Sequence, residues 1–214
     1  MLAWFFFRRC YFSALLSLPG ADRIASVKVD PLRRWGALGI AAAVALASIY
    51  LVRYCRFNLQ AIAFSISGGS AFSVSENGTL GYVFTVSNPI FVTSIGIFDE
   101  GNNGLNAVYN VAIATNTGQV IAQAVIPAGT GATLVDGFRY VSITPVLLSP
   151  GTYKIFATYD KDIVDAVMTL AAITSASGVS YVESTSDTGF TFPSGNHFGL
   201  SSGYFGPNFR FTPQ

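Results

Sequence analysis

The chain has 214 residues, of which 51% are hydrophobic and 11% are charged, and its formal net charge is +1. That total combines two opposed parts: residues 1–64 hold eight Lys and Arg against two Asp and Glu, a net charge of +6, and residues 65–214 hold four against nine, a net charge of −5. The negative second part disfavours nucleic acid as a partner. Its lack of cysteine excludes disulfides, thiolate metal clusters and a catalytic cysteine there. We therefore expect a leader over 1–64 and one domain over 65–214, which is long enough to bury its own core.

An uncharged apolar run, residues 35–52, lies in the leader directly after Arg33 and Arg34. Its length is at the short end of what spans a membrane and at the long end of a signal-peptide core. Small and apolar residues cover every face without an amphipathic stripe, so we expect one apolar helix that precedes the folded domain. Because the basic residues before the run outnumber those after it, we expect residues 65–214 to lie outside the cytoplasm.

Two interpretations of the apolar run stay open. If it is a cleaved signal peptide, the small-x-small triplets at 45–47 and 61–63 are candidate cleavage sites. If it is an uncleaved anchor, Arg53 and Arg56 lie at its end and the chain contacts a membrane through this segment. Both interpretations predict a secreted or membrane-anchored protein with its C-terminal domain outside the cytoplasm.

Short segments rich in β-branched and aromatic residues alternate with turn signals after the leader. An Asn-Gly pair at 77–78 predicts a tight hairpin, and 116–118 predicts a second one. Pro145 is expected to end a strand, and the apolar spacing in 163–173 predicts a single short helix. In chain order, we expect strands at 72–76, 79–86, 90–98, 107–115, 119–126, 138–143, 152–159, 179–183, 190–192 and 208–211.

This pattern predicts an all-β fold, an antiparallel β-sandwich of jelly-roll-like or Ig-like type. Alternate residues of a strand point to the same side, so each strand contributes one set to the core. The predicted core residues are Tyr82, Phe84, Ile95, Ile97, Val111, Ile113, Phe138, Tyr140, Tyr153 and Ile155.

Several segments carry a resemblance to a known family. They are 81–86 (GYVFTV), 95–99 (IGIFD), the 101–105 loop, 137–141 (GFRYV), 148–153 and 203–209 (GYFGPNF). In order and spacing these segments resemble a secreted bacterial β-sandwich family whose members often carry PEP-CTERM sorting tails and whose function is not established. The resemblance covers about residues 79–212 and implies an exported β-sandwich. The sequence departs from the family at its end, which has no such tail, so the resemblance implies that any membrane attachment comes from the leader.

Catalytic groups are sparse in the body. His197 is the only histidine, and no nucleophile elbow of the Gly-x-Ser-x-Gly type accompanies it. Paired carboxylates for a hydrolase would come from Asp160, Asp162 or Asp165, but Asp160 and Asp162 flank a lysine, as is ordinary in a polar turn. We predict that the protein is not an enzyme, with a small extracellular hydrolase as the alternative.

One loop, DEGNNG at 99–104, suggests a weak calcium site. Asp99, Asn102 and Asn103 are the candidate ligands, because Ca²⁺ prefers oxygen donors at such spacing and the sixth position is glycine, as in an EF-hand. The match is partial, since Asn110 stands where a bidentate glutamate should be. A loop that uses Asn and Gly for left-handed backbone explains the same residues without an ion. No other cofactor is expected.

The last aromatic segment suggests a ligand-binding surface. Tyr204 and Phe205 could stack on sugar rings, and Asn208 could bond hydroxyl groups. The alternation of 208–212 puts Phe209 and Phe211 on one face, which is explained more simply by a strand that faces the core. We therefore predict a non-catalytic exported surface or extracellular-matrix module with glycans or other surface polymers as candidate ligands. A structural subunit that assembles through strand edges is a further alternative.

Overall fold

The computed structural model describes residues 48, 60–162, 167–189, 191–194, 197–198 and 203–214. The chain divides into two compact units, Met1–Leu59 and Gln60–Gln214. The apolar run at 35–52 lies outside the described residues apart from Ser48, and so does the helix expected there. None of the described residues belongs to a helix long and apolar enough to cross a membrane.

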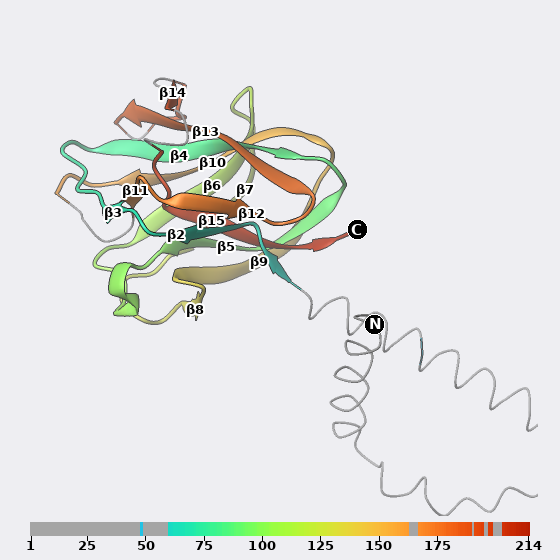
Figure 1. Cartoon of the computed structure of the whole chain (residues 1–214), viewed down its shortest axis with the longest axis horizontal. Helices are drawn as coiled ribbons and strands as arrows, with labels where there is room; N and C mark the ends of the chain where they lie inside the picture. The colour runs from blue at the N-terminus through green and yellow to red at the C-terminus, as the bar shows by residue number, and fades with distance from the viewer. Residues whose placement is uncertain (1–47, 49–59, 163–166, 190, 195–196, 199–202) are drawn as a thin grey trace, which may run out of the picture. The chain divides into compact units, whose positions relative to one another are not determined.

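The second unit is all-β and antiparallel, with two main sheets in a sandwich-like arrangement (Figure 1). The first sheet has the order β1 (Ala61–Ile62), β15 (Pro207–Pro213), β5 (Ile90–Phe98), β9 (Phe138–Leu148) and β8 (Thr133–Val135). The second has the order β14 (His197–Phe198), β13 (Val179–Thr188), β4 (Gly78–Val86), β10 (Gly151–Tyr159), β6 (Tyr109–Thr115) and β7 (Val120–Ile126). Two small pairs join β3 (Ser70–Ala71) to β11 (Met168–Thr169) and β2 (Phe64–Ser67) to β12 (Ala172–Ser175). Over the described part of 60–214 the only helical element is a 3-10 turn, Glu100–Asn102.

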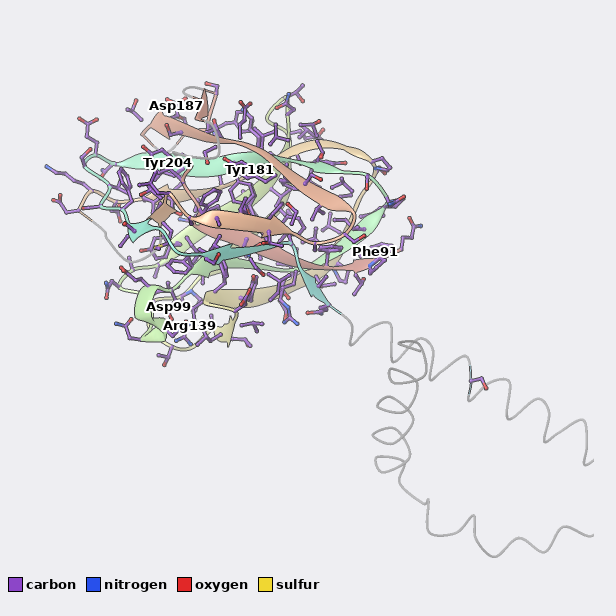
Figure 2. The ribbon with its side chains drawn as sticks, in the orientation of Figure 1. Phe91, Asp99, Arg139, Tyr181, Asp187 and Tyr204 are labelled. Atoms are coloured by element: carbon purple, nitrogen blue, oxygen red, sulfur yellow. The ribbon has the colours of Figure 1, made fainter. Side chains whose placement is uncertain are left out.

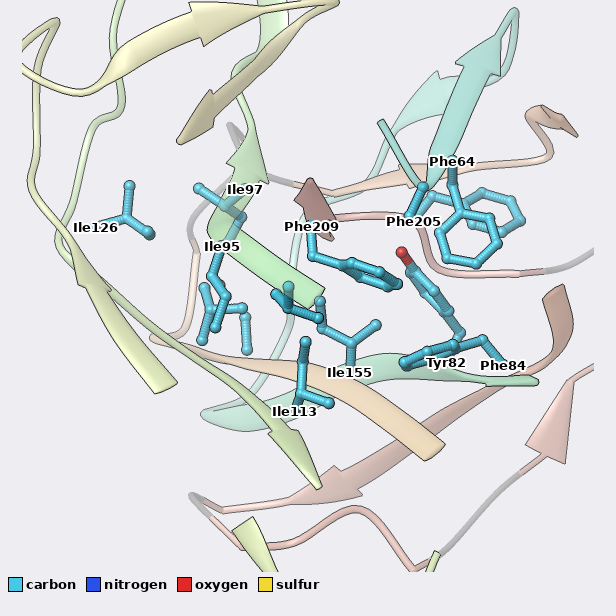
Figure 3. Close-up of a cluster of buried hydrophobic side chains, with 14 of the residues drawn as sticks. Phe64, Tyr82, Phe84, Ile95, Ile97, Ile113, Ile126, Ile155, Phe205 and Phe209 are labelled. Atoms are coloured by element: carbon cyan, nitrogen blue, oxygen red, sulfur yellow. The ribbon is translucent and has the colours of Figure 1, made fainter. Parts of the chain in front are cut away.

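The two main sheets share one core. The rings of Phe84 on β4 and Phe209 on β15 lie 5.0 Å apart, and the buried hydroxyl of Tyr82 donates to the Pro207 carbonyl at 2.8 Å (Figure 3). Seven of the ten predicted core residues lie in this shared core, and an eighth, Tyr153, is partly buried against it. Phe138 and Tyr140 are buried as well, but they pair with Phe98 and Gly96, which alternate with the core-facing Ile95 and Ile97, so they lie on the other face of the five-stranded sheet. Period-two alternation therefore identified the inner faces of β4, β5, β6 and β10 correctly, but not that of β9, where Val141 and Ile143 pack against the core.

Most of the expected strands are present. The strand predicted at 90–98 matches β5, and those at 152–159 and 208–211 match β10 and β15 closely. The hairpin joined by 116–118 is confirmed, because β6 pairs with β7 in an antiparallel register.

The hairpin predicted at Asn77-Gly78 is wrong. Gly78 begins β4, which pairs with β13 and β10 and not with the residues just before it. Asn77 instead joins two distant loops: its side-chain oxygen accepts the Lys161 N–H at 2.8 Å, and its carbonyl accepts the Gly189 N–H at 2.9 Å. Neither Asn77 nor Gly78 has the positive φ that a type I′ turn requires at both of its central residues.

The helix predicted at 163–173 is also wrong over its described residues, which form β11 and part of β12. The apolar positions that suggested a helix, Val167 and Ala171, are indeed buried. Leu170 between the two strands has a positive φ of 57° and turns the chain. The four-residue spacing of these buried side chains, which is typical of a helix, is produced here by β11, the turn at Leu170 and β12.

Pro145 does not end its strand, because β9 continues to Leu148. The register with β5 shifts at this place, from Ser94 opposite Ser142 to Val92 opposite Val146. Pro145 therefore lies in an irregular stretch, where its missing N–H breaks no regular ladder bond.

The domain begins before residue 65. β1 pairs with β15, and the Ala63 N–H continues this contact by donating to the Phe209 carbonyl at 2.9 Å. Phe64 is 1% exposed and lies edge-on against Tyr82, with ring centroids 5.1 Å apart. Residues 61–64, which the charge pattern assigned to the leader, belong to the sandwich in this structure.

Candidate functional site

The expected calcium loop is organised around a buried ion pair. Asp99 is 1% exposed, and its Oδ2 accepts the Arg139 Nε–H at 2.6 Å (Figure 2). The Gly104 N–H donates to both carboxylate oxygens of Asp99, at 3.2 Å to Oδ1 and 3.1 Å to Oδ2. The rest of the guanidinium donates to the carbonyls of Asn102, Thr130 and Ala132. One arginine thus ties the 3-10 turn to the segment before β8.

This geometry disfavours a cation at Asp99. The guanidinium is itself a positive charge in direct contact with the carboxylate, and like charges in such a site repel. Asn102 and Asn103 are exposed, whereas Asp99 is buried, so the loop is not exposed throughout as the sequence suggested. Asn102 has φ of 58°, in agreement with the left-handed loop that requires no ion. The calcium site stays a prediction from the sequence alone, and the ion pair argues against it.

The aromatic segment near the end of the chain faces the core. Phe205 is 1% exposed and lies 5.3 Å from the Tyr181 ring. Asn208 is fully buried; its amide donates to the Phe64 carbonyl at 2.6 Å, and its oxygen accepts the Phe209 N–H at 2.8 Å. Neither residue can contact a surface ligand in this structure, which corrects that part of the expected site. Tyr204 is partly buried, with its ring 4.9 Å from that of Phe72.

The candidate catalytic residues are not brought together. Asp160 and Asp162 are exposed in a turn, and Asp165 lies outside the described residues. His197 is in β14, where its backbone pairs with Thr185. The described part of the chain holds no cluster of three His, Cys, Asp or Glu side chains suited to a metal ion.

A different feature, a hollow of about 410 Å³, lies along β10, β6 and β7 of the six-stranded sheet. It is lined by Asn110, Val111, Ala112, Val120, Gln123, Ala124, Val125, Phe156 and Thr158. Phe156 alternates with the fully buried Ile155 and Ala157, so its side chain points away from the core. Gln123 alternates in the same way with Ala122 and Ala124. We call this surface the outer hollow.

The outer hollow combines one aromatic ring with groups that form hydrogen bonds. Phe156 and Thr158 are partly exposed on β10, and the amides of Asn110 and Gln123 are exposed on β6 and β7. Val125, which is 58% exposed, adds an apolar wall. The lining contains no carboxylate and no basic side chain among the described residues.

The segment after β13 buttresses this aromatic ring. The ring of Phe192 meets that of Phe156 nearly edge-on, with centroids 5.6 Å apart. Lys154 is only 5% exposed; its Nζ donates to the Pro193 carbonyl at 2.7 Å and lies 4.8 Å from the centre of the Phe192 ring. Desolvation by burial lowers the pKa of Lys154, and Glu183 opposes this effect. The strand expected at 190–192 is therefore wrong for Thr191 and Phe192, which form an irregular cover over the sheet.

Sequence reasoning missed the outer hollow although one signal pointed to it. The period-two rule that assigned Tyr153 and Ile155 to the core also places Phe156 and Thr158 on the opposite face. An aromatic residue on that face could have marked a candidate surface. Its neighbours on β6 and β7 follow only from strand order, which a single sequence does not specify.

Comparison with known proteins does not assign a function to these residues. No protein-family model matches the chain, and no curated protein matches it.

Proposed function

We propose that this chain is a non-catalytic exported β-sandwich module of the cell surface or extracellular matrix, and that it binds a glycan or a similar polar polymer at the outer hollow. The observation that supports the proposal is the composition of the hollow, in which the partly exposed Phe156 ring lies among two amides and a hydroxyl. The proposed binding surface therefore lies on the six-stranded sheet and not near Tyr204, where the sequence suggested it.

The chemistry of the hollow suits a sugar. An aromatic ring presents a flat apolar face to the C–H groups of a pyranose, while the amides of Asn110 and Gln123 can both donate to and accept from hydroxyl groups. Binding sites commonly combine an apolar lining with a few polar groups that fix orientation. The lack of a charged lining residue favours a neutral polymer over an ionic one.

A glycan-array screen of Gln60–Gln214 tests the proposal. We expect binding to at least one neutral polysaccharide, and we expect Phe156→Ala to abolish it while the protein stays folded. Phe91→Ala is the matched control, because Phe91 is also partly exposed but belongs to β5 of the other main sheet (Figure 2). Equal losses in both variants, or no glycan bound by the unmodified domain, would refute the assignment.

The proposal that the protein is exported rests on features of the leader. The basic flank and the apolar run at 35–52 support a signal peptide or an anchor, and the resemblance to a secreted bacterial β-sandwich family supports the same location. Replacing Ala41 and Val44 by Asp should block export, since each charge at the centre of such a run costs about 2.5–3.5 kcal/mol on insertion scales. Normal export of the double variant would contradict the proposal.

The fold distinguishes the two candidate cleavage sites. Cleavage after residue 63 would remove β1 and the Ala63 contact with Phe209, whereas cleavage after residue 47 leaves the sandwich whole. If the signal is cleaved, we propose the earlier site. Mass spectrometry of the exported protein would identify its first residue.

A further inference from the structure

β7 is the longest strand at any edge of the two main sheets. It has seven residues, whereas the other edge strands, β1, β8 and β14, have two, three and two. Over the described residues no strand pairs with the outer side of β7. Folded proteins commonly protect such an edge with charges, proline or a very short strand. The sequence of β7, VIAQAVI, uses none of these devices.

Exposed apolar side chains gather beside this edge. Seven large hydrophobic side chains are prominent at the surface of the described residues, and three of them belong to β7 or lie just before its partner β6: Val108, Val120 and Val125, which are 55%, 48% and 58% exposed. The edge therefore offers both free backbone groups and apolar surface, which are what a pairing strand requires.

The sequence of β7 is nearly symmetric about Gln123. If two copies pair antiparallel with Gln123 opposite Gln123, then Ala122 meets Ala124 on each side of it. Residues directly opposite in an antiparallel pair share a face of the sheet. The pairing therefore matches core-facing alanines with alanines and exposed glutamine with glutamine, so both cores lie on the same side.

We propose that a second copy of this chain binds at the β7 edge, in an antiparallel pairing centred on Gln123. Because the same strand is used by both copies, the contact is isologous and closes as a two-fold dimer. The two six-stranded sheets then join across the contact. The β6–β7 register shifts beside Ile121, so the central residues 122–124 lie in the regular part of the strand.

The dimer would also unite two outer hollows, because Gln123 and Val125 line the hollow and lie next to the two-fold axis. Two sites on one rigid sheet can bind one polymer with a higher apparent affinity than either site alone. Association itself requires no polymer. The oligomeric state therefore tests the dimer separately from the glycan assignment.

Charge substitution at the axis provides the first test. Full chains with two different C-terminal tags are co-expressed and extracted with detergent, and unmodified copies should co-purify. Gln123→Lys should abolish co-purification with itself, and so should Gln123→Glu, because like charges then stand directly opposite. A Lys copy expressed with a Glu copy should co-purify again. This rescue shows that both variants fold; self-association of either charged variant would overturn the proposal.

A cross-link at the axis provides the second test. In a full chain with Cys10→Ser and Cys55→Ser, Gln123→Cys places two thiols opposite each other, at a Cβ spacing of about 4.5–5.5 Å, near the range in which disulfides form. Mild oxidation should give a covalent dimer. Val182→Cys is the control, since Val182 is 46% exposed on β13, which is separated from β7 by three strands in the sheet order. Equal cross-linking at the two positions would refute the pairing.

Discussion

At the scale of single residues, the buried Arg139–Asp99 pair is a contact whose loss should be costly. Arg139→Met would leave the Asp99 carboxylate buried without its counter-charge, and breaking a buried ion pair in this way typically costs about 3–5 kcal/mol. Urea unfolding measures the loss. The double variant with Asp99→Asn should be clearly more stable than the single one, because no buried charge then remains. Equal stabilities of the single and double variants would show that leaving Asp99 without Arg139 has no extra cost.

The same pair leads to a prediction about calcium. Since the guanidinium contacts the only buried carboxylate of the 99–104 loop, we expect thermal melts with Ca²⁺ and with a chelator to superimpose. A ligand that binds only the folded state raises the melting temperature by mass action. A clear rise with Ca²⁺, lost in an Asn102→Ala variant, would restore the site suggested by the sequence.

Buried tyrosines should make the fold sensitive to alkali. Burial raises the pKa of Tyr82, Tyr159, Tyr140 and Tyr181 above the usual value. These groups keep their protons in the folded state while the unfolded chain loses them above about pH 10, so stability is present below that pH and falls above it. Lys154 acts in the opposite sense at somewhat lower pH, because its lowered pKa makes the folded state release its proton first.

The free energy of unfolding should therefore fall steeply above about pH 10, and tyrosinate absorbance should appear together with unfolding. Tyr82→Phe should reduce this slope at a cost of about 0.5–1.5 kcal/mol for the hydrogen bond to Pro207. Ionisation of every tyrosine of the domain well before unfolding would contradict the burial of the Tyr82 and Tyr159 hydroxyls.

At the scale of the elements, β4 depends on one glycine. A Cβ placed on Gly81 would lie 2.0 Å from the carbonyl oxygen of Ile155 on the neighbouring β10. Gly81→Ala must separate two central strands, and such overpacking costs about 1–3 kcal/mol or more. Gly131→Ala is the matched control, because nothing lies within 4 Å of its added carbon. Denaturant unfolding should show a large loss for the first variant and little change for the second.

Element by element, the sequence predicted what depends on local periodicity and missed what depends on distant partners. β5 and the β6–β7 hairpin follow from alternation and a turn signal. The Asn77-Gly78 hairpin is absent because Gly78 already belongs to β4, where it pairs with Tyr159 and Thr188, two residues far along the chain. Of the expected surface residues, Phe205 and Asn208 are buried by strands β2 and β4, whose proximity only the fold reveals.

At the scale of the whole molecule, the domain boundary can be tested by truncation. A chain starting at Gln60 retains β1 and Phe64, whereas one starting at Ser65 lacks both. Losing a fully buried phenylalanine side chain typically costs about 3–5 kcal/mol. We expect the longer chain to fold as a soluble all-β domain and the shorter one to be much less stable by circular dichroism and thermal melting. Equal melting temperatures would place the boundary back at residue 65.

The position of β15 affects when this fold can close during synthesis. β15 lies inside the five-stranded sheet, between β1 and β5, although the ribosome makes it after every other strand of the sandwich. Until it emerges, Phe209 and Phe211 are missing from the core, and the first strand has no partner. Pairings across such long sequence separations form late and slowly. A growing chain would thus remain open until residues 207–213 appear.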